Sequence, residues 1–263
     1  MIRFDHLQAV DFSPAVRFLQ RALALPQVID FKRRSHALLS VGPGCRVLDA
    51  GCGTGDDAAA IACLVAPGGK VVGLDASADI VNEARCRHAK ATHAPEFFRG
   101  DVMALPFDDG HFDATRADRL LHFLREPAAA LREMIRVTRP GGHVVIGEPD
   151  WDSLLVHGGD EESTTRVLAA AVSGSQASPT IGRRLPALFA QGGLAVKAVD
   201  TAVLELDSIE ESRYFFRLDA LAVRSLGPSM AQRWLASQAA FGSRLRCSLT
   251  SYTVAGQRVG SVA

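Results

Sequence analysis

Three glycines stand at every second position, Gly51, Gly53 and Gly55, between a short apolar run and a stretch of small apolar residues. In a turn between a strand and a helix, glycines let a ligand approach the backbone closely, because no Cβ stands in the way. Unpaired N–H groups at the start of the following helix are then available to the ligand. Residues 46–57 therefore predict the strand, glycine loop and helix that open a nucleotide-binding βαβ unit.

Acidic residues surround this glycine loop, with Asp49 before it and Asp56 and Asp57 after it. They would repel a pyrophosphate at the helix N-terminus, at about 1–4 kcal/mol per carboxylate when the charges are partly buried. A ligand with a cationic end fits better. S-adenosylmethionine carries an α-ammonium and a sulfonium and has no phosphate, so we expect Asp49 to accept a hydrogen bond from its ammonium.

A further acid stands where a ribose-binding carboxylate is expected: Asp75 ends the predicted strand 70–75, 20 residues after Gly55. Residues 46–148 resemble a class I S-adenosylmethionine-dependent methyltransferase, of the small-molecule type that includes ubiquinone and menaquinone biosynthesis. The matching stretches occur in the family's order and are Val-Leu-Asp-Ala-Gly-Cys-Gly-Thr-Gly (47–55), Gly-Leu-Asp-Ala-Ser (73–77), Gly-Asp-Val-Met-Ala-Leu-Pro-Phe (100–107), Phe-Asp-Ala (112–114) and Arg-Val-Thr-Arg-Pro-Gly-Gly (136–142).

This resemblance implies S-adenosylmethionine as cofactor and S-adenosylhomocysteine as product. It also implies that the Asp101 carboxylate accepts from the adenine amino group, that the Val102 backbone N–H meets the ring, and that Arg116 pairs with the cofactor carboxylate. A turn-capping role for Asp101 is the alternative. The residues expected to contact the cofactor are Asp49, Gly51, Gly53, Thr54, Asp75, Ala76, Asp101, Val102 and Arg116.

Candidates for catalysis follow the fourth and fifth predicted strands, because ligands bind outside the carboxyl ends of strands in open α/β sheets. His122 is the best single base, since a histidine titrates near neutral pH, and it resembles the family's recurrent histidine after the fourth strand. Glu148 and Asp150 are expected to orient a substrate amine or hydroxyl, or to assist His122. Structural roles are the alternatives: a backbone-bonded His122, a loop contact for Glu148, and a turn cap for Asp150.

The elements that must position these residues alternate between strand and helix, which predicts helices on both faces of a parallel sheet. We expect a Rossmann-like, doubly wound α/β fold in one domain spanning 1–263, with a cofactor-binding core at 41–150. Helices in 1–40 and inserts at 151–180 and 208–247 are expected to form a lid over the substrate. The seven predicted strands are about 46–50, 70–75, 96–100, 111–116, 144–148, 194–206 and 248–258.

Composition narrows the function class without deciding it. Lys+Arg and Asp+Glu number 29 each in 263 residues, which disfavours a nucleic-acid or membrane partner. The five cysteines are scattered, with no zinc-ligand spacing. No apolar signal core or run of 18 apolar residues occurs. We therefore expect a cytoplasmic enzyme without a metal, acting on a small molecule as a monomer or homodimer.

Methyl transfer from S-adenosylmethionine to an oxygen or nitrogen of a small molecule is the leading hypothesis, with His122 as base. A C-methyltransferase of a quinone-like metabolite stays open. An RNA or protein methyltransferase also stays open, although residues 116–119 depart from the motif of amino-methylating DNA enzymes. A nicotinamide oxidoreductase is disfavoured by the acidic glycine loop. A cofactor-binding protein without catalysis would preserve the same motifs.

Overall fold

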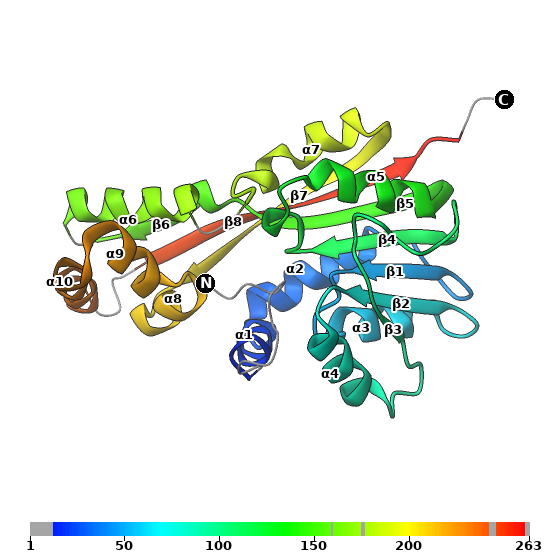
Figure 1. The fold of residues 1–263 in the computed structure, drawn as a ribbon, viewed down its shortest axis with the longest axis horizontal. Helices are drawn as coiled ribbons and strands as arrows, with labels where there is room; N and C mark the ends of the chain where they lie inside the picture. Colours follow the sequence, from blue (N-terminus) through cyan, green and yellow to red (C-terminus); the bar gives the residue numbers. More distant parts are fainter. Residues whose placement is uncertain (1–12, 159, 175–176, 242–245, 261–263) are drawn as a thin grey trace.

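The computed structural model describes residues 13–158, 160–174, 177–241 and 246–260 (Figure 1). Residues 1–12 of the expected N-terminal helical segment and 242–245 of the second expected insert lie outside the described residues. In the described part of the chain, eight strands form one sheet. They are β1 (Arg46–Ala50), β2 (Lys70–Asp75), β3 (Glu96–Arg99), β4 (Phe112–Asp118), β5 (Thr138–Pro149), β6 (Leu155–His157), β7 (Leu194–Leu206) and β8 (Arg246–Arg258).

The strand order is β3-β2-β1-β4-β5-β8-β6, and β7 also pairs with β8. The first five strands run parallel, whereas β8 is antiparallel to β5, β6 and β7. The order reverses between β1 and β4, and such a switch point opens a crevice at the carboxyl ends of the strands. The expected Rossmann-like fold with a mostly parallel sheet is confirmed.

The sheet has one strand more than the seven expected. This strand, β6, has only three residues and lies in the polar stretch after β5, so it carries no visible alternation. It pairs with the first residues of β8, beyond the point where β5 ends. The long strands β7 and β8 therefore continue past the parallel part of the sheet (Figure 1).

Helices cover both faces of the sheet because the strands alternate their apolar residues between the two faces. Val144 and Ile146 pack in the core beside α5 and α7, and Val145 packs in the core beside α3 and α4. The helices are α1 (Ser13–Leu23), α2 (Pro26–Ala37), α3 (Asp56–Val65), α4 (Ala78–His88), α5 (Pro127–Val137), α6 (Glu161–Gly174), α7 (Ile181–Gln191), α8 (Ile209–Phe215), α9 (Leu218–Leu226) and α10 (Pro228–Ala239).

The inserts after β5 and β7 lie beside the last residues of β7 and the first residues of β8, where α6, α8, α9 and α10 pack together (Figure 1). Their buried side chains form an apolar core of their own, centred on Val167, Phe216 and Trp234, and Ala22 of α1 joins it. We call these four helices together with α1 the lid. Among the described residues, no helix is long and apolar enough to cross a membrane.

Candidate active site

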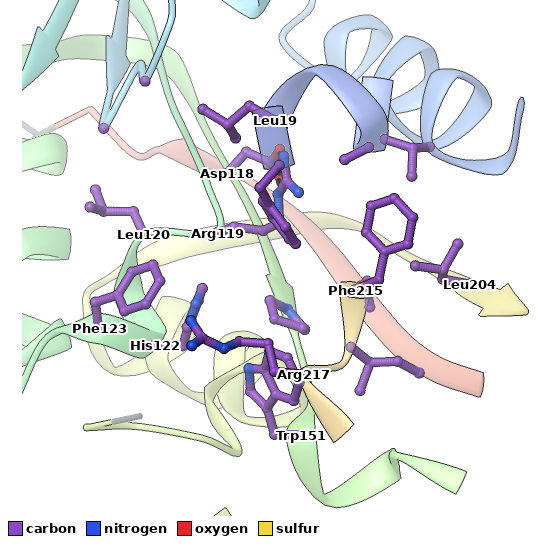
Figure 2. A pocket seen from close by; sticks show the side chains of 18 of the residues that line it. Leu19, Asp118, Arg119, Leu120, His122, Phe123, Trp151, Leu204, Phe215 and Arg217 are labelled. Carbon is purple, nitrogen blue, oxygen red and sulfur yellow. Dashed lines mark ion pairs between the residues drawn. The ribbon is translucent and has the colours of Figure 1, made fainter. Parts of the chain in front are cut away.

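A cavity of about 1000 Å³ lies at the carboxyl ends of β1, β2 and β4, between the sheet and the lid (Figure 2). Its glycine-loop half is lined by Gly51, Gly53, Leu74, Asp75, Ala76, Ile80, Gly100, Asp101 and Val102. Its lid half is lined mainly by apolar side chains, among them Phe18, Leu25, Phe123, Trp151, Leu204, Phe215 and Leu249. The two halves are one continuous space, large enough for two small ligands side by side.

The glycine loop turns sharply because its three glycines adopt left-handed backbone conformations. Gly51, Gly53 and Gly55 have φ values of 71°, 54° and 81°, a region that costs residues with a Cβ about 1–2 kcal/mol. A Cβ on Gly51 would also stand 2.9 Å from the Leu120 side chain, which lines the cavity. The loop backbone thus forms one wall that a ligand can approach closely.

Two acids on neighbouring strand ends face this half of the cavity. Asp75 accepts hydrogen bonds from the N–H groups of Gly53 (3.2 Å) and Ser77 (3.0 Å), and burial raises its pKa. Asp101 is exposed on the cavity wall and accepts from Met103 N at 2.8 Å. The turn-capping contact and the cavity position of Asp101 therefore coexist. The acids and open backbone of this half fit a ligand with hydroxyls and amines better than a phosphate.

Asp49 and Arg116 do not line the cavity, which corrects the expected ammonium and carboxylate contacts. Both are buried, and Arg116 Nη1 lies 3.1 Å from Asp49 Oδ1 and 3.3 Å from Asp57. Its second terminal nitrogen lies 3.5 Å from Asp118. A guanidinium surrounded by three carboxylates is not available to a cofactor carboxylate. Burial raises the pKa of Asp49, although Arg116 opposes this shift.

Lys32 of α2 completes this buried charge cluster and was missed by the sequence analysis. Its ammonium pairs with Asp57 and lies 3.0 Å from Asp118. Burial alone would raise the pKa of Asp118, but the cations outweigh it, with Lys32 first, and lower the value to about 2. The cluster thereby fixes α2 against the glycine-loop helix α3 and the end of β4.

Thr54 is buried outside the cavity wall, which also corrects its expected contact with the cofactor. Its hydroxyl donates to Asp56 at 2.6 Å. Asp56 receives a longer contact from Arg87 of α4 at 3.3 Å. Thr54 therefore stabilises the glycine loop on the side away from the cavity, and the loop positions that line the cavity are Gly51 and Gly53.

His122 lies on the cavity wall, in the short 3-10 turn Leu121–Phe123 after β4 (Figure 2). Its Nδ1 lies 2.6 Å from Glu148 Oε2, and both side chains are buried. The same carboxylate accepts from the backbone N–H groups of Leu120 at 2.8 Å and of Leu121. An ionised carboxylate can only accept, so Nδ1 carries a proton in this contact, and Nε2 is the nitrogen that acts as a base when the imidazole is neutral.

Glu148 is fully buried and outside the cavity wall, so it positions His122 and does not meet a ligand. Of the two expected roles, this contact supports assistance to His122, which stays a prediction, and the position of Glu148 outside the wall does not favour substrate orientation. Asp150 is also buried outside the wall, where it accepts from Asp152 N at 3.2 Å and pairs with Arg183 of α7. Its expected contact with substrate or His122 is therefore wrong, and it caps the turn before Trp151.

Two of the arginines on the cavity wall have an unusual backbone conformation that was not predicted. Arg119 and Arg217 have φ values of 54° and 55°, which is the left-handed region that non-glycine residues avoid. Arg119 lies 3.5 Å from Asp118. Nothing in the local sequence indicates this conformation at either residue, because backbone strain is visible only in the folded chain.

The described residues contain no group of three or more histidine, cysteine or acidic side chains arranged to hold a metal ion. The polar groups available to a ligand are therefore the backbone of the glycine loop, the acids Asp75 and Asp101, and His122 with its partner Glu148. Such a set suits binding of a nucleoside-like ligand in one half and removal of a proton in the other.

Residues 47–142 match a family model described as a methyltransferase domain. An uncharacterized 37.1 kDa protein in transposon TN4556 of Streptomyces fradiae is 36% identical over 247 residues, which cover 92% of this chain and 71% of that protein. A demethylmenaquinone methyltransferase of Lactococcus lactis is 34% identical over 137 residues, covering 49% of this chain and 54% of that enzyme. The chain thus spans about half the length of this quinone methyltransferase.

The fold is shared with a solved S-adenosylmethionine-dependent methyltransferase from Aquifex aeolicus. That structure has a TM-score of 0.55 and 15% sequence identity, and the match covers 92% of this chain and 98% of that one. Identity this low speaks for the fold alone. The domain match, the similarity to the demethylmenaquinone methyltransferase and the strand order agree with the resemblance read from the five sequence stretches. The chain therefore belongs to the class I S-adenosylmethionine-dependent methyltransferases.

Proposed function

We propose that the protein transfers the methyl group of S-adenosylmethionine to a hydroxyl or amine of a small, mainly apolar molecule, with His122 as the base. The observation that carries this proposal is the continuity of the cavity. One space joins the glycine loop to the His122–Glu148 pair. A cofactor in the first half and an acceptor in the second would meet inside it.

The glycine-loop half supports S-adenosylmethionine as the ligand. Asp75 at the end of β2 is placed to accept from ribose hydroxyls, and Asp101 and Val102 form the wall where an adenine would lie. Ala76, Gly51 and Gly53 leave room for close contact. Asp49 stands behind the loop with Oδ2 unpaired among the described residues, so it adds negative potential toward a cationic methionine end.

When bound, S-adenosylmethionine supplies an electrophilic methyl group on a cationic sulfur. The protein's own contribution is then positioning, exclusion of water and proton removal. The apolar lid half excludes water from the acceptor. Glu148 holds Nδ1–H of His122, so Nε2 is the atom that takes the proton from an attacking hydroxyl, or from the ammonium that forms when a neutral amine is methylated.

Methylation of a carbon in a quinone-like acceptor is the second candidate. The apolar lining of the lid half and the demethylmenaquinone methyltransferase among the relatives support it. Proton removal from an activated ring would also use His122. The two candidates differ in the bond formed: C-methylation places the new methyl group on carbon, and its carbon-13 chemical shift distinguishes it from a methyl group on oxygen or nitrogen.

The test is a methyl-transfer assay with S-adenosylmethionine carrying a tritiated methyl group, offered to matched phenols, amines and reduced quinones. We expect labelled small product from wild type and a loss of about 10²–10⁴ in kcat with His122→Ala, while affinity for S-adenosylhomocysteine stays unchanged. Label that appears only in protein or RNA of a cell extract would contradict the small-molecule acceptor. Full activity of His122→Ala would contradict its role as base.

A further inference from the structure

We propose that the acceptor carries an anionic group on an apolar body, and that Arg217 binds this group in the lid half of the cavity. This inference rests on the function proposed above and names its substrate class. Arg217 stands in the turn between α8 and α9 and lines the cavity. In Figure 2 its side chain extends from this turn toward His122.

The charge of Arg217 is not neutralised by the protein. Four other cations line the cavity: Lys32 and Arg119 face Asp118 at 3.0 and 3.5 Å, and Arg125 and Arg224 are exposed to solvent. Unlike Lys32 and Arg119, Arg217 makes no hydrogen bond or ion pair with any described side chain, and unlike Arg125 and Arg224 it is partly buried. The acids of the cavity wall are Asp75, Asp101 and Asp118, and all three belong to the strand ends. A guanidinium aimed into an apolar space without a carboxylate is suited to an anionic ligand group.

The backbone at Arg217 supports a functional reason for this placement. Its φ of 55° and ψ of 40° put an arginine where a glycine would sit without strain. Such conformations persist in folded proteins where the surroundings enforce them, and they gather at ligand sites. Arg217 lies between Phe216 and Leu218, both buried in the lid core, which hold the turn in this conformation.

The surroundings of Arg217 define the rest of the ligand. Trp151, Leu204, Phe215 and Leu249 line the same half of the cavity. A small hydrophilic anion would leave these surfaces unfilled, and a neutral hydrocarbon would leave the guanidinium unpaired. An amphiphile satisfies both, with its acid group on Arg217 and its apolar chain along the lid. The acid is a carboxylate or a phosphate, since both accept from a guanidinium in the same paired geometry.

The test uses competition with a neutral fluorescent reporter, N-phenyl-1-naphthylamine, in the presence of saturating S-adenosylhomocysteine. The competitors are 1-decanol, decanoate and decyl phosphate, which share one chain and differ in the head group. On wild type, we expect at least one of the anions to displace the reporter at a concentration at least tenfold lower than decanol. The stronger of the two anions distinguishes carboxylate from phosphate.

Substitution of Arg217 separates this contact from general charge effects. In Arg217→Gln the ratio between anion and alcohol should fall to near one, while the affinity for decanol stays within twofold. Arg217→Gly removes the same guanidinium and relieves the backbone strain, so it provides a variant that folds at least as well as wild type. Arg213→Gln is the matched control: it removes one positive charge from the neighbouring α8, where Arg213 is exposed and paired with Asp219, and it should keep the ratio.

Equal displacement by decanol and by both anions on wild type would overturn the inference. An anion preference that survives in both Arg217 variants would overturn it as well. Failure of the reporter and all competitors to bind would also do so, because the inference requires an apolar site open to a ten-carbon chain. Absence of S-adenosylhomocysteine binding would instead contradict the proposed function. The two failures are therefore distinguishable.

Discussion

Glu148 offers the sharpest test of how the cavity produces a base. Its carboxylate is fully buried and is surrounded by four donors: His122 Nδ1 at 2.6 Å and the backbone N–H groups of Leu120, Leu121 and His122. In Glu148→Gln one oxygen remains to accept, and the new amide N–H group faces donors. Two of the four hydrogen bonds are lost by this count.

The expected size of the effect follows from those contacts. A hydrogen bond to a charged group contributes about 1.5–3 kcal/mol, so two lost bonds amount to about 3–6 kcal/mol. Removal of a buried charge also relieves a desolvation cost that opposes folding. We therefore expect the free energy of unfolding to fall by about 2–4 kcal/mol. Because Nδ1 loses its acceptor, kcat should fall by about 10²–10⁴, the range in which a positioned base contributes.

The assay is a double-mutant cycle with His122→Ala, Glu148→Gln and the pair together, measured as kcat and KM for one acceptor across pH. If Glu148 acts only through His122, kcat of the double variant should lie within about threefold of kcat of His122→Ala. The pH dependence of kcat that belongs to the base should disappear in the two variants that lack His122. Losses that multiply in the double variant would refute the positioning role.

Three further predictions concern the buried charge cluster and the glycine loop. Lys32→Met should lower the free energy of unfolding by about 3–5 kcal/mol at pH 7, because it leaves buried Asp57 and Asp118 without the Lys32 ammonium. The control Arg33→Met removes an exposed ion pair on the same helix and should cost at most about 1 kcal/mol. Both values are measured by urea unfolding. The loss of stability in Lys32→Met should shrink as pH falls from about 4 toward 2, because the native pKa of Asp118 lies below its unfolded value of 3.8. The ionised Asp118 stabilises the fold above this pH range, and the stabilisation is lost as the carboxylate is protonated. An equal loss at pH 7 and pH 2.5 would contradict this. Gly51→Ala should weaken S-adenosylhomocysteine binding at least tenfold in calorimetry by driving Leu120 into the cavity, while Gly44→Ala, with the same left-handed φ but open space around it, should bind normally.

Much of the core could be predicted because its signals are local. The glycines of the loop, the acid at the end of each strand and the alternation of strand and helix each occupy a short stretch. Asp75, Asp101 and His122 accordingly line the cavity as expected. The short strand β6 could not be predicted, because three residues are too few to show an alternation of apolar and polar side chains. It is defined by its pairing with β8.

The roles of the charged residues could not be predicted in the same way, because each depends on partners far along the chain. Arg116 stands at a position that suits a cofactor contact, yet Asp49 and Asp57 pair with it from other elements. Glu148 lies 26 residues from His122, so their contact requires β5 to lie beside β4.

The lid was the least predictable part. Its core joins Val167, Phe216 and Trp234 with α1 from the other end of the chain. The sequence predicts helices in the inserts, but the apolar face of each helix does not indicate which other helix it packs against. Arg217 is visible as a cavity residue only after this core is assembled.

The central claim is that the glycine-loop half binds S-adenosylmethionine, and calorimetric titration tests it most directly. S-adenosylhomocysteine is titrated into wild type, Asp75→Ala and the control Asp79→Ala, which changes an acid on α4 outside the cavity wall, with NADH as the comparison ligand. We expect micromolar binding of S-adenosylhomocysteine to wild type and the control, at least tenfold weaker binding to Asp75→Ala, and no binding of NADH. Binding of NADH in place of S-adenosylhomocysteine, or an affinity that Asp75→Ala leaves unchanged, would contradict the assignment of this half of the cavity.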